Sequence, residues 1–171
     1  VDLLIESLRH LPENFKLRLV GRFRAEKNVD PGWLQSLTAD PLIEKKLELE
    51  LTDHIQDVAA EIDQCDILVQ PASQDVNDSR YATPQKAFGY MARGKPILVA
   101  DVPCHHELFN DGINGLMFDL SPQALAERAQ FLCSQPDLAA KIALGAWQTA
   151  ELFTYERRAA DILSLIEHVS T

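Results

Sequence analysis

The fold is decided by residues 65–101, which read CDILVQPASQDVNDSRYATPQKAFGYMARGKPILVAD. Two nearly continuous apolar runs, at 66–70 and 96–100, are typical of strands that are buried on both faces of a parallel sheet. Between them, Thr83-Pro84 combines a favoured N-cap residue with a first-turn proline and predicts a helix that runs to about Arg93. The stretch therefore predicts a strand, a crossover helix and a second strand.

The same alternation of strand and helix extends outward in both directions. Further strands are predicted at 17–20, 47–51 and 115–118, each next to a segment with helical spacing of apolar residues. We therefore expect a Rossmann-like, doubly wound parallel sheet with helices on both faces, built as a single domain over residues 1–171. The sequence opens inside a helical period, so the first strand of such a sheet is missing and is expected just upstream of Val1.

The composition argues against several classes of protein. There are 16 Lys and Arg against 26 Asp and Glu, a net charge of −10, and no basic cluster is long enough to follow a nucleic-acid backbone. No apolar run approaches the roughly 20 residues of a transmembrane helix. Cys65, Cys104 and Cys133 are an odd number without C-x-x-C spacing, which indicates neither a disulfide framework nor a zinc site and favours a cytoplasmic protein.

The carboxyl ends of the strands are where an open α/β sheet binds its ligands. The loop after 66–70 leads to the helix start at Thr83-Pro84. There, the backbone N–H groups of Gln85 and Lys86, the helix dipole and the Lys86 ammonium would form an anion site suited to a diphosphate. Taken alone, such a pair more often does no more than start a helix.

Other motifs carry less weight. His105-His106-Glu107 suggests a metal site, but adjacent residues point to different sides of a helix and cannot grip one ion as i, i+4 ligands do. Arg22 and Arg24 follow the strand at 17–20, although a solvated basic loop explains them equally well. The sequence contains no nucleophile elbow, P-loop or dinucleotide fingerprint, which disfavours hydrolases, nucleoside triphosphatases and dehydrogenases.

One series of segments is specific as a whole. Its central part is TPQKAFGYMARGKPILVAD at 83–101, and the other parts, in order, are VDLLIESL at 1–8, LRLVG at 17–21, CDILVQP at 65–71, DGINGLMFD at 111–119 and FTYERRA at 153–159. The series resembles the C-terminal domain of group 1, family 4-like retaining GT-B glycosyltransferases, whose pattern P-x-K-x-x-E-Y-M-A-x-G-x-P-I-V is similar to the central part. The resemblance covers nearly the whole chain.

The resemblance implies a donor-binding site and its partners. It implies a nucleoside diphosphate sugar, bound without a metal ion between this domain and a missing N-terminal domain, and a glycan or lipid-linked acceptor. The family's two motif glutamates contact the sugar hydroxyls and the ribose, and the matching positions are Tyr81, which can still bond a hydroxyl, and Gly89, which has no side chain. No catalytic residue is assigned. The candidate donor-binding residues are Gly21, Arg22, Arg24, Ser73, Tyr81, Thr83, Pro84, Gln85, Lys86 and Gly89.

Three functions stay open at this point. The first is the donor-binding half of a hexosyltransferase-like enzyme, which is inactive as a fragment and could reach a membrane only through the missing domain. The second, suggested by Tyr81 and Gly89, is a degenerate, non-catalytic nucleotide-sugar-binding or scaffolding module in polysaccharide assembly. The third and weakest is an unrelated α/β binding domain.

Overall fold

The computed structural model describes residues 1–21, 32, 39–51, 58–72, 81 and 84–169. Its strands are β1 (Leu17–Gly21), β2 (Leu47–Leu51), β3 (Leu68–Gln70), β4 (Ile97–Ala100) and β5 (Leu116–Phe118). Its helices are α1 (Asp2–Ser7), α3 (Pro41–Glu44), α4 (Val58–Asp63), α6 (Gln85–Ala92), the 3₁₀ helix η2 (Pro103–Glu107), α7 (Pro122–Cys133), α8 (Pro136–Ala150) and α9 (Tyr155–Val169).

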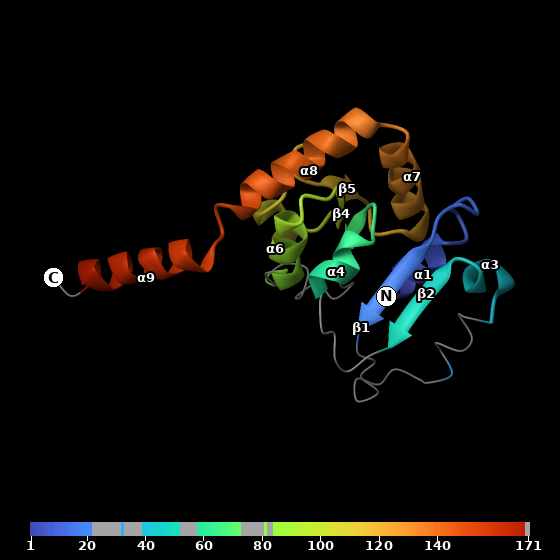
Figure 1. Cartoon of the computed structure of the whole chain (residues 1–171), viewed down its shortest axis with the longest axis horizontal. Coiled ribbons are helices and arrows are strands. Elements are labelled where there is room, and N and C mark those ends of the chain that lie inside the picture. The colour runs from blue at the N-terminus through green and yellow to red at the C-terminus, as the bar shows by residue number, and fades with distance from the viewer. Residues whose placement is uncertain (22–31, 33–38, 52–57, 73–80, 82–83, 170–171) are drawn as a thin grey trace.

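The strands form parallel ladders, as the alternation of strand and helix predicts. β1 pairs with β2, and β3, β4 and β5 pair in that order, with Leu98 of β4 opposite Leu116 of β5. The predicted α/β class, a parallel sheet flanked by helices, is confirmed (Figure 1). Among the described residues the strands form two separate ladders, because no pairing joins β1 to β3.

Helices pack on both faces of the β3-β4-β5 sheet because successive side chains of a strand point to opposite faces. Leu98 of β4 belongs to a buried cluster that also contains Leu4 of α1 and Leu125 of α7. Its neighbour Val99 belongs to a different cluster, together with Met91 of α6. The strands are thus apolar on both faces, which explains their unbroken runs of apolar residues.

The turn before β5 packs tightly against α8. A Cβ added at Gly145 of α8 would lie 2.2 Å from the carbonyl oxygen of Ile113, so only glycine allows this approach. The buried Asn114 side chain strengthens the same contact. Its Nδ2 donates to the carbonyl of Leu108 at 2.9 Å and to the hydroxyl of Thr149 at 3.0 Å. These contacts fix β5 relative to α8.

A buried lysine joins the β1-β2 ladder to α1. Lys46 lies directly before β2 and is only 6% exposed. Its Nζ donates to the carbonyls of Leu8 at 3.0 Å and Leu11 at 2.6 Å. The Leu8 carbonyl lies at the carboxyl end of α1, where the helix dipole favours a positive charge.

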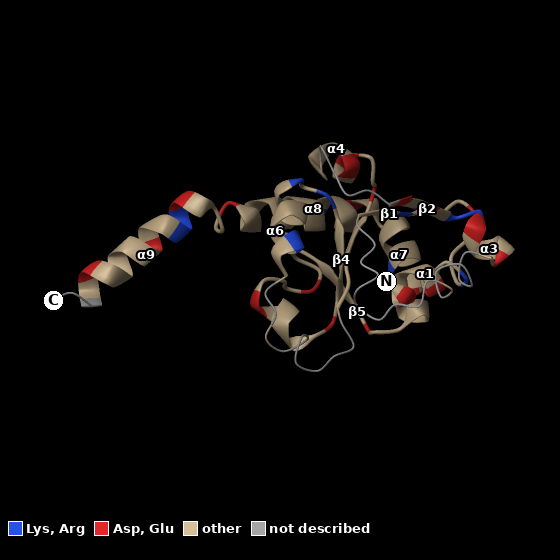
Figure 2. Ribbon diagram, turned by 90° about the horizontal axis from the view of Figure 1, so that it is seen from below, with Lys and Arg blue, Asp and Glu red and all other residues tan. Residues whose placement is uncertain are grey.

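The C-terminal part of the chain consists of two long helices, α8 and α9. α8 packs against α6 and α7, whereas α9 projects away from the rest of the chain (Figures 1 and 2). All side chains of α9 from Tyr155 to His168 are exposed. None of the described helices combines the length and the apolar composition that crossing a membrane requires.

Candidate functional site

The predicted anion site centres on the first turn of α6. The chain crosses from β3 to its parallel neighbour β4 through α6, so the first turn of α6 lies at the carboxyl edge of these strands. Ala87 and Met91 are fully buried and hold one side of α6 against the sheet. Gln85, Lys86 and Gly89 lie together on the exposed side.

The structure corrects the predicted start of this helix. α6 begins at Gln85, and Pro84 occupies the N-cap with φ −75° and ψ 87°, without a side-chain capping bond. The prediction of Thr83 as N-cap and Pro84 as first helical residue is therefore wrong by one position. The proline ring fixes φ but leaves ψ free to take a non-helical value. The N–H groups of Gln85 and Lys86 are thus first-turn donors, which have no acceptor within a helix.

The charge around α6 favours an anion. The chain as a whole is acidic, but α6 carries Lys86 and has no acidic residue (Figure 2). Lys86 is exposed and is the second residue of α6, so its positive charge belongs to the same turn as the first-turn N–H groups. Backbone donors and an ammonium at one helix start are the groups that bind phosphate in proteins.

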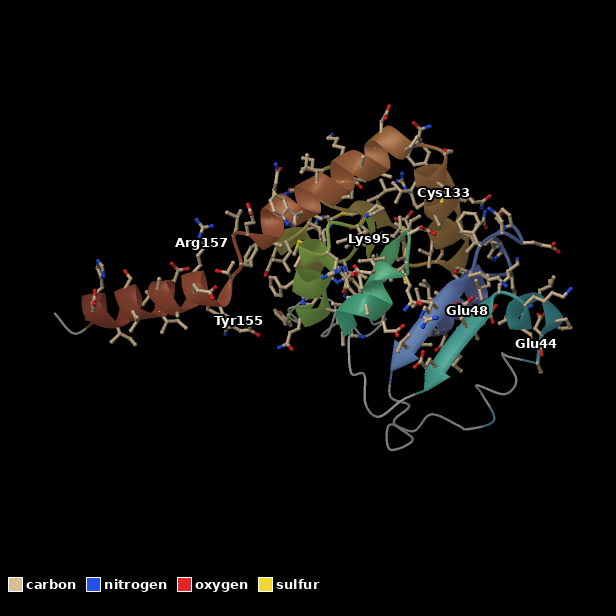
Figure 3. All side chains as sticks on the ribbon, in the orientation of Figure 1. Glu44, Glu48, Lys95, Cys133, Tyr155 and Arg157 are labelled. Carbon is tan, nitrogen blue, oxygen red and sulfur yellow. The ribbon has the colours of Figure 1, made fainter. Side chains whose placement is uncertain are left out.

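The opposite end of α6 is held in place by contacts with the carboxyl end of α4. Arg93, the C-cap residue, donates from Nε to Oδ1 of Asp63 at 2.8 Å. The Nζ of Lys95 donates to the carbonyls of Asp63 at 2.9 Å and Cys65 at 2.8 Å (Figure 3). One end of the helix is therefore anchored while the other presents its donors.

The structure also describes the predicted site residues Tyr81, Gly21 and Gly89. Tyr81 is 80% exposed, and Gly21 ends β1 at the carboxyl edge of the other ladder. A Cβ added at Gly89 would meet no atom within 4 Å, so this position has room for a side chain. The remaining predicted residues, Arg22, Arg24, Ser73 and Thr83, lie outside the described residues.

The adjacent histidines do not face each other. His105 is 2% exposed, and its Nδ1 donates to the carbonyl of Ala100 at 2.7 Å. Burial lowers the pKa of His105 and so favours the neutral imidazole. His106 is exposed, and its Nε2 lies 2.7 Å from Oδ1 of Asp101. The two rings therefore point to different partners.

The structure also has a hollow that the sequence did not reveal. It has a volume of about 350 Å³ and lies beside α7 and the carboxyl ends of β4 and β5. Its lining residues are Asp101, Asp111, Met117, Phe118, Asp119, Ala124, Glu127, Arg128 and Phe131. Four carboxylates against one guanidinium disfavour a diphosphate there, since like charges repel. The first turn of α6 is the better anion site.

Comparison with known proteins identifies the family. The sequence pattern of the glycosyl transferase-like family matches residues 2–164. No curated relative matches the chain by sequence. A glycosyltransferase from Rickettsia africae is 21% identical, with a TM-score of 0.84 over 99% of this chain and 44% of its own. HepE from Anabaena, solved with UDP-glucose, is 20% identical, with a TM-score of 0.77 over 95% of this chain and 44% of its own.

A third similar structure shows which half of a longer enzyme the chain resembles. It is the C-terminal domain of a group 1 glycosyl transferase from Francisella tularensis, 16% identical, with a TM-score of 0.62 over 86% of this chain and 89% of that domain. The chain spans less than half the length of the Rickettsia and Anabaena proteins. Its fold is that of the C-terminal domain of GT-B glycosyltransferases, and the chain belongs to the glycosyl transferase-like family.

Proposed function

We propose that this chain is, as a single domain over residues 1–171, the donor-binding half of a retaining, family 4-like glycosyltransferase. It binds a nucleoside diphosphate sugar, whose sugar is transferred to a glycan or lipid-linked acceptor in polysaccharide biosynthesis. The observation that carries the proposal is the exposed first turn of α6, with Lys86 beside it, at the carboxyl edge of the sheet. The UDP-glucose complex of the similar Anabaena protein supports this class of donor.

The chemistry proposed for α6 is electrostatic. When the sugar leaves the donor, negative charge develops on the departing diphosphate. The N–H groups of Gln85 and Lys86 and the Lys86 ammonium can stabilise that charge without a metal ion, and Arg22 and Arg24 would add to it. Donors that are fixed in advance need no reorganisation during the reaction, which is why an anchored helix suits this role.

The two separate ladders support the proposal that a further strand precedes the chain. A doubly wound sheet has the strand order 3-2-1-4-5-6. If β1 and β2 are the second and third strands, and β3 to β5 are the fourth to sixth, the first strand belongs between β1 and β3. That is the one junction at which the described strands are not paired. Residues upstream of Val1 would supply this strand.

The exposed α9 supports the proposal of an N-terminal partner domain. Tyr155, Ile162 and Ile166 follow helical spacing along one side of α9 and are 87%, 47% and 56% exposed. An amphipathic helix of this length gains most of its stability from packing. The similar Rickettsia protein matches nearly all of this chain with only 44% of its own length. The rest of that protein is therefore longer than this chain and long enough for a second domain. We propose that the corresponding N-terminal domain covers this side of α9.

A cytoplasmic location completes the proposal. Cys65, Cys104 and Cys133 are all free thiols in the structure. Burial raises the pKa of Cys65 and of Cys104 and so favours the unreactive thiol form. Free thiols suit a reducing compartment.

The alternative function is a non-catalytic module that binds or assembles around nucleotide sugars. Its support comes from Gly89, which lacks the carboxylate that the resemblance leads us to expect for the ribose. The space at this position permits a direct test by Gly89→Glu, because a Cβ added at Gly89 meets no atom within 4 Å. We expect this substitution to tighten UDP binding about tenfold by adding a charged hydrogen-bond acceptor. Gly89→Ala, which changes the helix without adding a carboxylate, is the control.

Calorimetric titration with nucleoside diphosphates and their sugars tests the function itself. Saturable binding that is weakened by Lys86→Ala but not by Lys141→Ala, on the exposed surface of α8, is the expected result. If no nucleotide binds even when the chain is extended by its upstream strand, the donor-binding proposal fails. Binding without sugar transfer in the complete two-domain protein would favour the non-catalytic module.

A further inference from the structure

The side chain of Gln70 has a hydrogen-bonding atom that no described residue satisfies. Gln70 is the last residue of β3 and is only 7% exposed. Its Oε1 is shielded from solvent, and in the described part of the chain no group donates to it. Buried polar atoms in native proteins nearly always have a partner, so an atom of this kind calls for an explanation.

The orientation of this amide is fixed by its other atom. Nε2 donates to the carbonyl of Pro71 at 3.1 Å. A carbonyl can only accept, so the NH₂ group must face Pro71, and exchanging the two amide atoms would place two acceptors together. The free atom is therefore the acceptor Oε1, and the partner that it lacks is an O–H or N–H donor.

The position of Gln70 relates this acceptor to α6. In β3, Leu68 and Gln70 are buried while Val69 between them is less so, and residues two apart on a strand share a face. Leu68 packs in the same cluster as Ala87 and Met91, which places Gln70 on the side of the sheet that α6 covers. The carboxyl end of β3 and the first turn of α6 lie at the same edge. Gln70 thus lies on the α6 side of the sheet, at the edge where α6 begins.

We propose that the Oε1 of Gln70 accepts a hydrogen bond from a hydroxyl group of the bound nucleotide sugar. This inference rests on the proposed function, because it needs a ligand at the first turn of α6. The first-turn N–H groups and Lys86 bind the diphosphate, and Gln70 distinguishes a ligand with a correctly placed hydroxyl from a bare anion. Because Oε1 is shielded in the free chain, the groups that cover it shift when the hydroxyl binds. The hydroxyl belongs either to the ribose or to the transferred sugar.

The test uses Gln70→Met, which keeps the length of the side chain and removes both hydrogen-bonding atoms. The whole chain is titrated calorimetrically with UDP-glucose, UDP and inorganic pyrophosphate. We expect Gln70→Met to weaken UDP-glucose binding about five- to tenfold and to leave pyrophosphate binding unchanged. A loss with UDP-glucose alone assigns the hydroxyl to the sugar, and an equal loss with UDP assigns it to the ribose. Gln148→Met, at an exposed position of α8, is the matched control.

A second readout separates ligand binding from a structural role. In the free chain, Gln70→Met removes an unpaired buried acceptor together with one weak contact, so the urea midpoint of unfolding should stay the same or rise. A lowered midpoint with unchanged binding of UDP-glucose would overturn the inference and indicate a partner within the protein or a buried water. An equal loss for pyrophosphate would also overturn it. If none of the three binds to the unaltered chain or to the chain extended by its upstream strand, the proposed function fails too, whereas normal binding by Gln70→Met overturns only the role of Gln70.

Discussion

At the scale of single residues, two glycines inside helices have opposite surroundings. A Cβ at Gly89 of α6 would meet open space, whereas a Cβ at Gly145 of α8 would lie 2.2 Å from the backbone oxygen of Ile113. Gly145 is therefore required by the packing of α8 on the turn before β5. Among the described residues no close contact requires a glycine at position 89, and glycine there weakens α6 by about 1 kcal/mol relative to alanine.

This contrast predicts opposite effects of one substitution. Gly145→Ala should lower the free energy of unfolding by about 2 kcal/mol or more, because backbone must move to accept the methyl group. Gly89→Ala should raise it by up to about 1 kcal/mol. Urea denaturation monitored by circular dichroism measures both values. Equal stability of the two variants would contradict the close packing of α8 against the turn before β5.

A second prediction at this scale concerns pH. Burial lowers the pKa of His105 below the value of 6.5 that it has when exposed in the unfolded chain. The unfolded chain then binds more protons than the folded chain as the pH falls through that value. Stability contributed by the neutral, buried ring is therefore present above about pH 6.5 and is lost below it.

The measurement is the free energy of unfolding between about pH 7.5 and about pH 5.5. His105→Gln should reduce its pH dependence, because the titrating ring is removed. His106→Gln is the matched control, since His106 is exposed and lies beside Asp101. Equal pH profiles for the unaltered chain and His105→Gln would show that His105 does not titrate on unfolding in this range.

At the scale of elements, periodicity predicts what depends on local sequence. The apolar runs at 66–70 and 96–100 predict β3 and β4. At their N-terminal ends, β3 is two residues shorter and β4 one residue shorter than predicted. The predicted start of α6 is wrong by one residue because the proline ring of Pro84 fixes φ but not ψ. The hollow beside α7 and the buried amide of Gln70 depend on side chains brought together from different elements. No local pattern could have revealed them.

The elements also differ in how much they contribute to the stability of the chain, and substitutions in α9 test this difference. Because Ile162 and Ile166 are exposed, the double substitution Ile162→Ser and Ile166→Ser should change the free energy of unfolding of this chain by less than about 0.5 kcal/mol. Ile142→Ser, at a fully buried position of α8, should lower it by several kcal/mol. In a longer protein that includes the N-terminal domain, the double substitution should destabilise the domain pair.

A large loss of stability in this chain alone would contradict the proposal for α9. It would mean that the apolar side of α9 packs on its own domain. Urea denaturation of both variants, measured in this chain and in the longer protein, distinguishes the two cases.

At the scale of the whole molecule, the chain combines an acidic composition with one helix start that is suited to an anion. The net charge of −10 would repel a diphosphate at a distance, so binding must come from short-range donors at α6. In such a fold, ligands bind at the edge of the sheet formed by the carboxyl ends of the strands. The strands of both ladders and the proposed upstream strand end at this edge, and α6 begins there. We therefore expect a nucleoside diphosphate to bind at the first turn of α6.

The most direct measurement is an NMR titration of the whole chain with UDP, following the backbone amide signals. We predict saturable shifts of the Gln85 and Lys86 amides, with little change at the residues around the acidic hollow, such as Asp119 and Glu127. In Lys86→Ala the Gln85 amide should need more UDP to reach saturation. Shifts confined to the acidic hollow would contradict this binding site, as would the absence of saturable shifts at Gln85 and Lys86 both in this chain and in the chain extended by its upstream strand.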